Sequence, residues 1–302
     1  MATNDFLPFA GGAGANVLTQ AAYIAQSALR SNGFSAGTAQ SAQLNKVWRQ
    51  ASIMSAVLAQ LISDNTGQDV LDDGTTSTIL ANLKNATAGR LIGVQNFASS
   101  GTYTYTPTAG TKSVVVEVQG AGGSGGGTAA TSAGQAAVGG GGAAGAYTKG
   151  RFTSGFAGVT ITVGIGGAQT AAGNNNGNAG ATSSFGSLLT ALGGGGGAGG
   201  GASSSFPFAS AGGVGTGAPT GGIVNKAGSS AVQPIALLAN VLVGSEGAPS
   251  VFGRGGQSFS TSGNGGPGLS GAGGGGACAG GVQPAFFGGN GGSGQVTIWE
   301  YA

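Results

Sequence analysis

The chain has 302 residues, of which 69 are glycine and 6% are charged, and its formal net charge at pH 7 is +2. So small and dispersed a charge excludes the basic surface that nucleic-acid binding requires. Because there is no histidine and only one cysteine, Cys278, the sequence also excludes Ser-His-Asp and Cys-His nucleophiles, histidine-ligated metals and an internal disulfide framework. We therefore expect a protein that is not an enzyme, holds no metal or cofactor and binds no nucleic acid.

The start of the chain carries no recognisable export signal. Residues 1–15 lack the basic start and the long apolar core of a secretion signal. No apolar run reaches the length of about 18 residues that spans a membrane. We expect synthesis in the cytoplasm without export, and we expect Cys278 to be a small buried residue.

Residues 1–93 have an ordinary composition and a helical pattern. A first helix is predicted from Val17 to Ala28, with Gly33 as its stop. A second helix is predicted over 41–64, where apolar residues follow the 3-4-3-4-3 spacing of a coiled-coil seam. The seam consists of Leu44, Val47, Ala51, Met54, Leu58 and Leu61.

Two interpretations of this seam stay open. It packs either against the other helices of its own chain or against the same helix of another subunit. We favour packing between subunits, because three short helices offer a thin core for a stable monomer. Four more apolar residues widen the stripe beyond what a two-stranded coiled coil needs: Trp48, Ile53, Val57 and Ile62.

After the seam helix, residues 64–74 gather four carboxylates. Their spacing does not match a calcium-binding EF-hand loop, so we interpret this stretch as a solvated turn. A third helix is predicted over about 77–88, with Gly89 at its end.

From residue 97 the apolar pattern has a period of two, which predicts β-strands. The last predicted strand is at the C-terminus and would return into the sheet and close the domain. The clearest strand candidates are residues 102–106, 112–119, 159–165, 183–189 and 295–301.

Glycine runs separate these strands, among them Gly139–Gly142, Gly193–Gly197 and Gly273–Gly276. Collagen is excluded because the strict Gly-X-Y period is absent and only 8 prolines occur. We expect extended helices with three residues per turn, packed side by side. Without Cβ atoms their backbones can approach closely enough for N–H and C=O groups to pair between neighbours. Disorder or a silk-like repeat is the alternative.

Six phenylalanines interrupt the glycine pattern, and we select them as candidate receptor-contact residues. If exposed, they would stack on sugars or enter an apolar groove, whereas if buried they would fill gaps in a domain short of large side chains. The six are Phe206, Phe208, Phe252, Phe259, Phe286 and Phe287.

The apolar run 234–243 is either a short buried helix or an exposed contact patch, and we favour packing in the core or between subunits. Catalysis has little support in the second half. Its acids after residue 100 are Glu117, Glu246 and Glu300, which sequence does not pair for glycoside hydrolysis. The glycines at 164–167 are not followed by the Gly-Lys-Ser/Thr of a phosphate-binding loop.

Residues 4–17 read NDFLPFAGGAGANV and residues 43–54 read QLNKVWRQASIM. This region resembles the N-terminal region of tail-fibre and tail-tip proteins of tailed bacteriophages. The second half is similar to the glycine-rich domain common at the C-terminus of such fibres, and also to the glycine-rich domain of certain animal receptor kinases. The motifs that carry this likeness are GTYTYTP at 101–107, VVEVQGAGG at 115–123, GAY at 145–147 and SSFG at 183–186.

The resemblance implies an α plus mainly β fold, with a short helical region followed by a jelly-roll-like β-sandwich that carries packed polyglycine-type helices. It implies a homotrimer in the virion, at the tail tip or tail fibre. Residues 1–93 would trimerise and attach to other tail or baseplate proteins. Residues 94–302 would bind a bacterial surface receptor, either a polysaccharide or an outer-membrane protein, without catalysis. A purely structural cap or spacer is the main rival, and a polysaccharide-cleaving enzyme is the third hypothesis.

Overall fold

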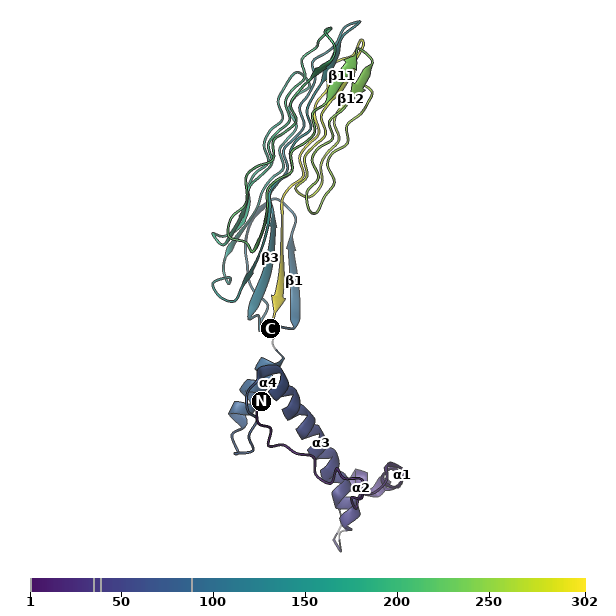
Figure 1. Cartoon of the computed structure of the whole chain (residues 1–302), viewed down its shortest axis with the longest axis vertical. Coiled ribbons are helices and arrows are strands. Elements are labelled where there is room, and N and C mark those ends of the chain that lie inside the picture. The colour runs from purple at the N-terminus through teal and green to yellow at the C-terminus, as the bar shows by residue number, and fades with distance from the viewer. Residues whose placement is uncertain (1, 35, 39, 88) are drawn as a thin grey trace. The chain divides into compact units, whose positions relative to one another are not determined.

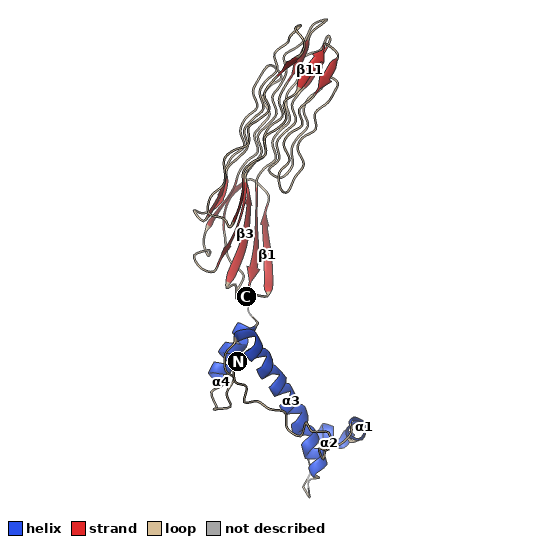
Figure 2. Cartoon of the chain, viewed as in Figure 1, coloured by secondary structure: helices blue, strands red, loops and turns tan. Residues whose placement is uncertain are grey.

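The computed structural model of the chain describes residues 2–34, 36–38, 40–87 and 89–302. The chain divides into two compact units, residues 1–90 and residues 91–302. The first unit holds the described helices and the second holds the sheets (Figure 2). Among the described residues, no helix is both long and apolar enough to cross a membrane.

The first unit is helical, as its sequence pattern predicts. The predicted first helix is divided into two short ones that end at Gly33, and α4 matches the third predicted helix, whose residue 88 lies outside the described residues. Gly67 ends α3 in the left-handed conformation, with its N–H donating to the Ser63 carbonyl oxygen. The helices are α1 (Gln20–Ala25), α2 (Ser27–Asn32), α3 (Ser41–Thr66) and α4 (Thr76–Ala86).

The core of this unit is small. Ala59, Ile62 and Val70 form its buried apolar cluster, and Phe6 and Ile79 are among the partly buried residues that pack against it. The buried face of α3 lies on the side of Ala56, Ala59 and Ile62, not on the side of the seam. So small an apolar core gives the unit few of the contacts that normally stabilise a domain.

The second unit begins with two antiparallel sheets. The C-terminal strand β14 (Gln295–Tyr301) lies between the first and third strands of the chain, so the predicted closure of the domain is confirmed. The five-stranded sheet has the order β1 (Leu91–Phe97), β14, β3 (Ser113–Gln119), β5 (Tyr147–Phe152), β10 (Val224–Lys226). The four-stranded sheet has the order β2 (Gly101–Thr104), β6 (Thr160–Val163), β7 (Ser183–Phe185), β8 (Leu189–Ala191).

These two sheets share one side-chain core. Val114, Val116 and Val118 are fully buried on one face of β3, as the alternation predicts. They meet side chains of the other sheet such as Ile161 and Phe185. The Tyr105 ring packs edge-on against the Phe185 ring, with 5.7 Å between their centroids. The two sheets are therefore held together by conventional apolar packing.

Beyond the sheets, the glycine-rich segments run side by side as extended loops (Figures 1 and 2). Segment 120–128 shows how they are held: successive N–H groups donate to three different neighbouring segments in rotation, and the fourth returns to the first. Its nine N–H groups donate at distances between 2.8 and 3.2 Å. Residues 120, 123 and 126 donate to residues 146, 143 and 140, and residues 121, 124 and 127 donate to residues 181, 178 and 175. Residues 122, 125 and 128 donate to residues 292, 289 and 286.

The carbonyl oxygens of the same segment accept bonds from further neighbours. Gly167, Gly194 and Gly274 donate to residues 122, 121 and 123 in turn. Segment 120–128 is therefore surrounded by other backbone, and it is fully buried. Two more fully buried runs are 139–146 and 271–277, and all three runs contain only glycine and alanine, apart from Ser124 and Thr128.

The close approach of these backbones explains why glycine is needed there. A Cβ atom at Gly125 would overlap the carbonyl oxygen of Gly275, and a Cβ atom at Gly273 would overlap that of Gly142. The obstacle in both places is backbone, which cannot rotate away as a side chain can. Glycine thus permits the hydrogen bonds that offset its large loss of conformational entropy on folding.

A second group of strands lies at the end of the glycine-rich segments opposite to β1 and β3 (Figure 1). It comprises a three-stranded sheet in the order β12 (Val241–Val243), β11 (Ile235–Leu238), β9 (Phe208–Ala209), and a pair formed by β4 (Ala136–Val138) and β13 (Cys278–Gly280). We call this end of the unit the tip and define it as residues 129–138, 201–209, 235–243, 258–264 and 278–287.

The apolar run 234–243 is thus a β-hairpin turning at Ala239 and Asn240, and the helical interpretation of it was wrong. Its β-branched residues and the turn-forming Asn240 favour a hairpin over a helix. The predicted strands at 112–119, 159–165 and 295–301 are confirmed as β3, β6 and β14. The single strand predicted over 183–189 is wrong in part, because the chain turns at residues 186–188 and forms the hairpin of β7 and β8.

Candidate functional site

The tip has a small core of its own. It consists of Ala136, Val138, Ala236, Leu242 and Cys278, all buried. These residues come from four strands in three separate parts of the sequence, namely β4, the hairpin of β11 and β12, and β13, which the fold brings to one place. Burial raises the pKa of the Cys278 thiol, and this residue is a small buried core member as predicted.

The hairpin β11–β12 covers this core with one face only. Ala236 and Leu242 are cross-strand partners that point into the core. The other face carries Leu238, which is 59% exposed, and its cross-strand partner Val241. Leu237 and Val243 are also exposed. Antiparallel hairpins usually present polar side chains to water on the outer face, so an apolar outer face is a distinctive feature of the tip.

The tip also lacks charge. None of its residues is Asp, Glu, Lys or Arg, and none is Tyr or Trp. Its polar side chains are hydroxyls and amides, and the hydroxyls of Ser203 and Thr131 form hydrogen bonds with neighbouring backbone. The tip therefore combines exposed aliphatic groups with neutral hydrogen-bonding groups.

The six candidate phenylalanines do not form one surface. Phe206 and Phe208 lie together, with 5.8 Å between their ring centroids, and both are half-buried against the tip core. Phe286 and Phe287 are half-buried as well, while Phe259 is exposed.

Phe252 is separate from the rest. Its ring lies 5.8 Å from that of Tyr147 at the start of β5, beside the sheets. The sequence interpretation missed the outer residues of the hairpin, although the apolar run itself was noted.

In the helical unit, the coiled-coil seam is largely uncovered. Leu44 is half-buried, whereas the other five seam residues are exposed, and Met54 reaches 69%. Burial of the seam within its own unit is therefore not what the structure shows. An apolar groove of about 300 Å³ adjoins the seam, since Leu58 belongs to both and Ile62 and Ile79 line the groove.

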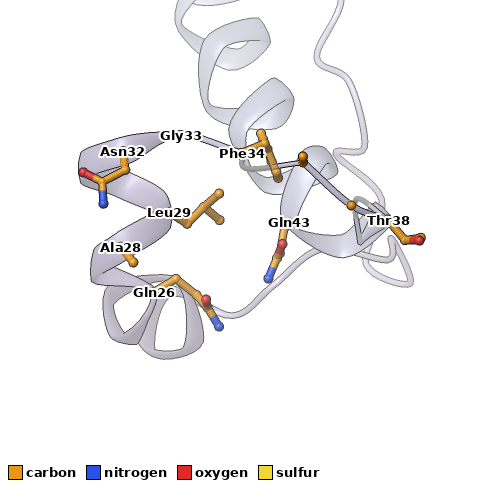
Figure 3. Close-up of a pocket in the computed structure, with 10 residues that line it drawn as sticks. Gln26, Ala28, Leu29, Asn32, Gly33, Phe34, Thr38 and Gln43 are labelled. Atoms are coloured by element: carbon orange, nitrogen blue, oxygen red, sulfur yellow. The ribbon is translucent and has the colours of Figure 1, made fainter.

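A second hollow of about 320 Å³ lies between α2 and the start of α3 (Figure 3). Leu29 points toward the hollow, and Phe34, Gln26, Asn32 and Gln43 are among the other residues that line it. Its described lining offers no acid, base or thiol that could perform chemistry.

Two acids of the second unit, Glu117 and Glu300, are engaged in structural contacts. Glu117 and Lys149 form an ion pair, with 2.9 Å between Glu117 Oε1 and Lys149 Nζ. Glu300 is fully buried and accepts hydrogen bonds from the Tyr105 hydroxyl at 2.6 Å, the Thr108 hydroxyl and N–H at 2.6 and 3.0 Å, and the Gln95 amide at 3.0 Å. These bonds tie the C-terminal strand to β1 and to the segment after β2.

Two opposing effects act on Glu300. Burial alone would raise the pKa of its carboxyl, but the hydrogen bonds from Thr108, Tyr105 and Gln95 outweigh burial and hold that pKa below its ordinary value. Burial, and then the contact with Glu300, raise the pKa of the Tyr105 hydroxyl. Within the described residues, no group of three or more acidic, cysteine or histidine side chains is placed to hold a metal ion.

A family model described as a glycine-rich domain matches residues 98–301. The match covers more than half of the chain and nearly all of the second unit, so the chain belongs to this family of glycine-rich domain proteins. A search of curated proteins found no match to the chain.

Proposed function

We propose that the chain is a bacteriophage tail-fibre or tail-tip adhesin that binds a receptor on the bacterial surface. The observation that carries the proposal is the position of the tip. Strand β1 and the C-terminus both lie at the sheet end of the second unit, and the exposed apolar hairpin lies at the far end of the glycine-rich segments (Figure 1). An uncharged contact surface presented at the end of a well-bonded support suits recognition.

We also propose that the glycine-rich segments are polyglycine-type helices on a jelly-roll-like sandwich. The rotation of N–H donors among three neighbours supports this, because three residues per turn return every third residue to the same side. The shared core of the two sheets supports the sandwich.

The N-terminal region, residues 1–93, trimerises the fibre and attaches it to other tail or baseplate proteins in this proposal. A heptad seam requires a partner helix with the same repeat, and a second copy of the chain supplies one. The exposure of Val47, Met54 and Leu61 supports it, because an isolated helix leaves these residues in water.

The full chain, labelled with a fluorophore, is tested for binding to a panel of bacterial strains. The adhesin proposal expects saturable binding to at least one strain and competition with virions that carry this chain. Binding to no strain at micromolar concentration, or binding without competition, contradicts it. Many weak contacts, multiplied by several copies, would give the affinity.

Trimerisation has its own test. Light scattering measures the mass of the full chain and of the Met54→Lys and Leu61→Lys variants. Three copies are expected for the original chain and fewer for the variants, because a buried unpaired charge is costly. Gln50→Lys is the control, since Gln50 is exposed on α3 and outside the seam. A monomeric original chain contradicts this part of the proposal.

A structural cap or spacer is the second candidate, and the dense backbone bonding of the buried glycine runs favours it. It expects that replacing the outer hairpin residues leaves the range of bound strains unchanged. A loss of binding on such a replacement contradicts it.

A further inference from the structure

We propose that the receptor of the tip is a protein with an apolar surface, and that the hairpin β11–β12 contacts it through its outer face. This inference rests on the proposed function, and it narrows the receptor from the broad class of bacterial surface molecules to one kind of partner. It follows from the exposed apolar outer face of the hairpin, from the lack of charged, Tyr and Trp residues in the tip, and from the edge position of β12.

The first argument is the pattern of burial along the hairpin. Strands with apolar residues on both faces are normally covered on both faces. Here one face packs on the tip core through Ala236 and Leu242, while the outer face leaves Leu238, Val241 and Val243 in water. Covering that face removes aliphatic surface from water, which is favourable by about 25 cal/mol per Å².

The second argument concerns sugars. A polysaccharide presents hydroxyl groups and often acidic groups, and burying these against aliphatic side chains leaves their hydrogen bonds unmade. The tip has no Lys or Arg to pair with an acidic sugar and no Asp or Glu to accept from hydroxyls. Its paired aromatic rings, Phe206 and Phe208, are half-buried against the tip core. The outer face thus offers poor chemistry for carbohydrate.

The third argument concerns lipid. Segments that sit in a membrane surface usually carry Trp or Tyr at the headgroup level and Lys or Arg toward anionic lipids. The tip contains none of these four residue types. A protein surface with an apolar centre and a neutral rim matches the tip. The apolar centre of such a partner would cover the aliphatic outer face of the hairpin. The partner's backbone could pair with neutral groups of the tip, such as the Ser204 hydroxyl and the Asn240 amide.

The position of β12 adds to the fit. It is an edge strand of the three-stranded sheet. An edge strand offers backbone groups to an extended segment of a partner, and a protein loop can supply such a segment whereas a sugar or a lipid cannot.

The experiment uses the full chain and a strain to which the original chain binds. The test variant is Leu238→Ser with Val241→Ser, which makes the outer pair polar without touching the tip core. The control variant is Ile223→Ser, an equally aliphatic residue that is 77% exposed but lies beside β10, outside the tip. Thermal unfolding and light scattering check that both variants keep the fold and the mass of the original chain.

The double variant is expected to bind the cells at least about tenfold more weakly, while the control binds like the original chain. Protease treatment of the cells is expected to abolish binding, whereas periodate treatment, which oxidises sugars, is expected to leave it. Raising NaCl from about 50 to about 500 mM is expected to change the affinity little, because no charge takes part.

Four results overturn the inference while leaving the adhesin proposal intact, and three of them concern binding. They are unchanged binding by the double variant, binding that survives protease but not periodate, and binding of the original chain to protein-free vesicles made from the lipids of the same strain. A change of mass in the double variant alone also overturns it, because the outer face then contacts a second copy of the chain. Failure of the original chain to bind any strain overturns the adhesin proposal, and this inference with it.

Discussion

The two packed sheets and the glycine-rich segments of the second unit lie next to each other, but different parts of the chain hold each of them together: side chains in the sheets and backbone groups in the glycine-rich segments. Between the two sheets, side chains such as Val116, Phe185 and Ile298 form a buried apolar core. In the glycine-rich part, the buried runs have almost no side chains, and their N–H and C=O groups bond to neighbours on several sides. A protein interior can therefore be built from backbone alone, provided that each segment finds partners all round it.

The two interiors should respond to mutation in opposite ways. A side-chain core is weakened when atoms are removed, because a cavity remains. A backbone interior is weakened when atoms are added, because no side chain can move aside. Four variants test this contrast. Stability is followed by denaturation of the full chain in a Trp48→Phe background, so that Trp299 in β14 reports on the second unit.

The largest loss is expected for Phe185→Ala. Phe185 is fully buried between the sheets and contacts the Tyr105 and Phe152 rings. Its truncation should lower the free energy of unfolding by about 3–5 kcal/mol. Phe259→Ala, at an exposed ring, is the control and should cost far less. Equal losses for the two would show that the core between the two sheets does not carry the stability assigned to it.

A somewhat smaller loss, about 3 kcal/mol, is expected for Gly125→Ala. The added methyl group would overlap the Gly275 carbonyl oxygen and push two buried runs apart. Gly217→Ala is the matched control, because a Cβ atom there meets nothing within 4 Å. The control should be neutral or slightly stabilising. If both substitutions behave alike, close backbone packing is not what selects glycine in the buried runs.

Glu300→Gln should cost about 2 kcal/mol at neutral pH, since it replaces the acceptor of several buried donors by an amide. The pKa of Glu300 is lowered in the folded chain, so its contribution is fully present above the unfolded pKa of about 4.3 and is lost as the pH falls below that through the folded pKa. Unfolding measured from neutral to acidic pH should therefore show the original chain and the variant converging below pH about 4. A constant difference across that range would contradict the role of the carboxylate charge.

The smallest effect is expected for Thr128→Val. Thr128 is fully buried at the end of segment 120–128, and within the described structure its hydroxyl has no hydrogen-bond partner. Replacing that hydroxyl by a methyl group of similar size should leave stability unchanged or raise it by up to about 1 kcal/mol. A clear loss would reveal a bound water that the hydroxyl holds.

Local sequence pattern was a good guide where structure depends on neighbouring residues. The period of two in 112–119 predicted β3. The helical spacing of the apolar residues in 41–64 predicted α3. The need for packed partners around the glycine runs also followed from composition, because isolated glycine chain does not stay ordered.

Long-range pairing was the part that sequence could not supply. All glycine runs look alike, so nothing local states that residue 125 donates to 289 and not to 275. The partners of Glu300 lie about 200 residues earlier in the chain, which hid the role of this residue. The half-burial of Phe206 and Phe208 depends on β11 and β13, which only the fold brings to them.

The rotation of donors among three neighbours also governs how this domain can change length. Inserting one or two residues into segment 120–128 would turn every later N–H toward the wrong neighbour, and the registers with the runs at 140–146, 175–181 and 286–292 would all fail together. Inserting three residues restores each donor to its own neighbour. Longer and shorter versions of this domain should therefore differ by multiples of three residues, inserted at matching positions in adjoining segments. Such insertions lengthen the glycine-rich part and leave the orientation of the tip unchanged.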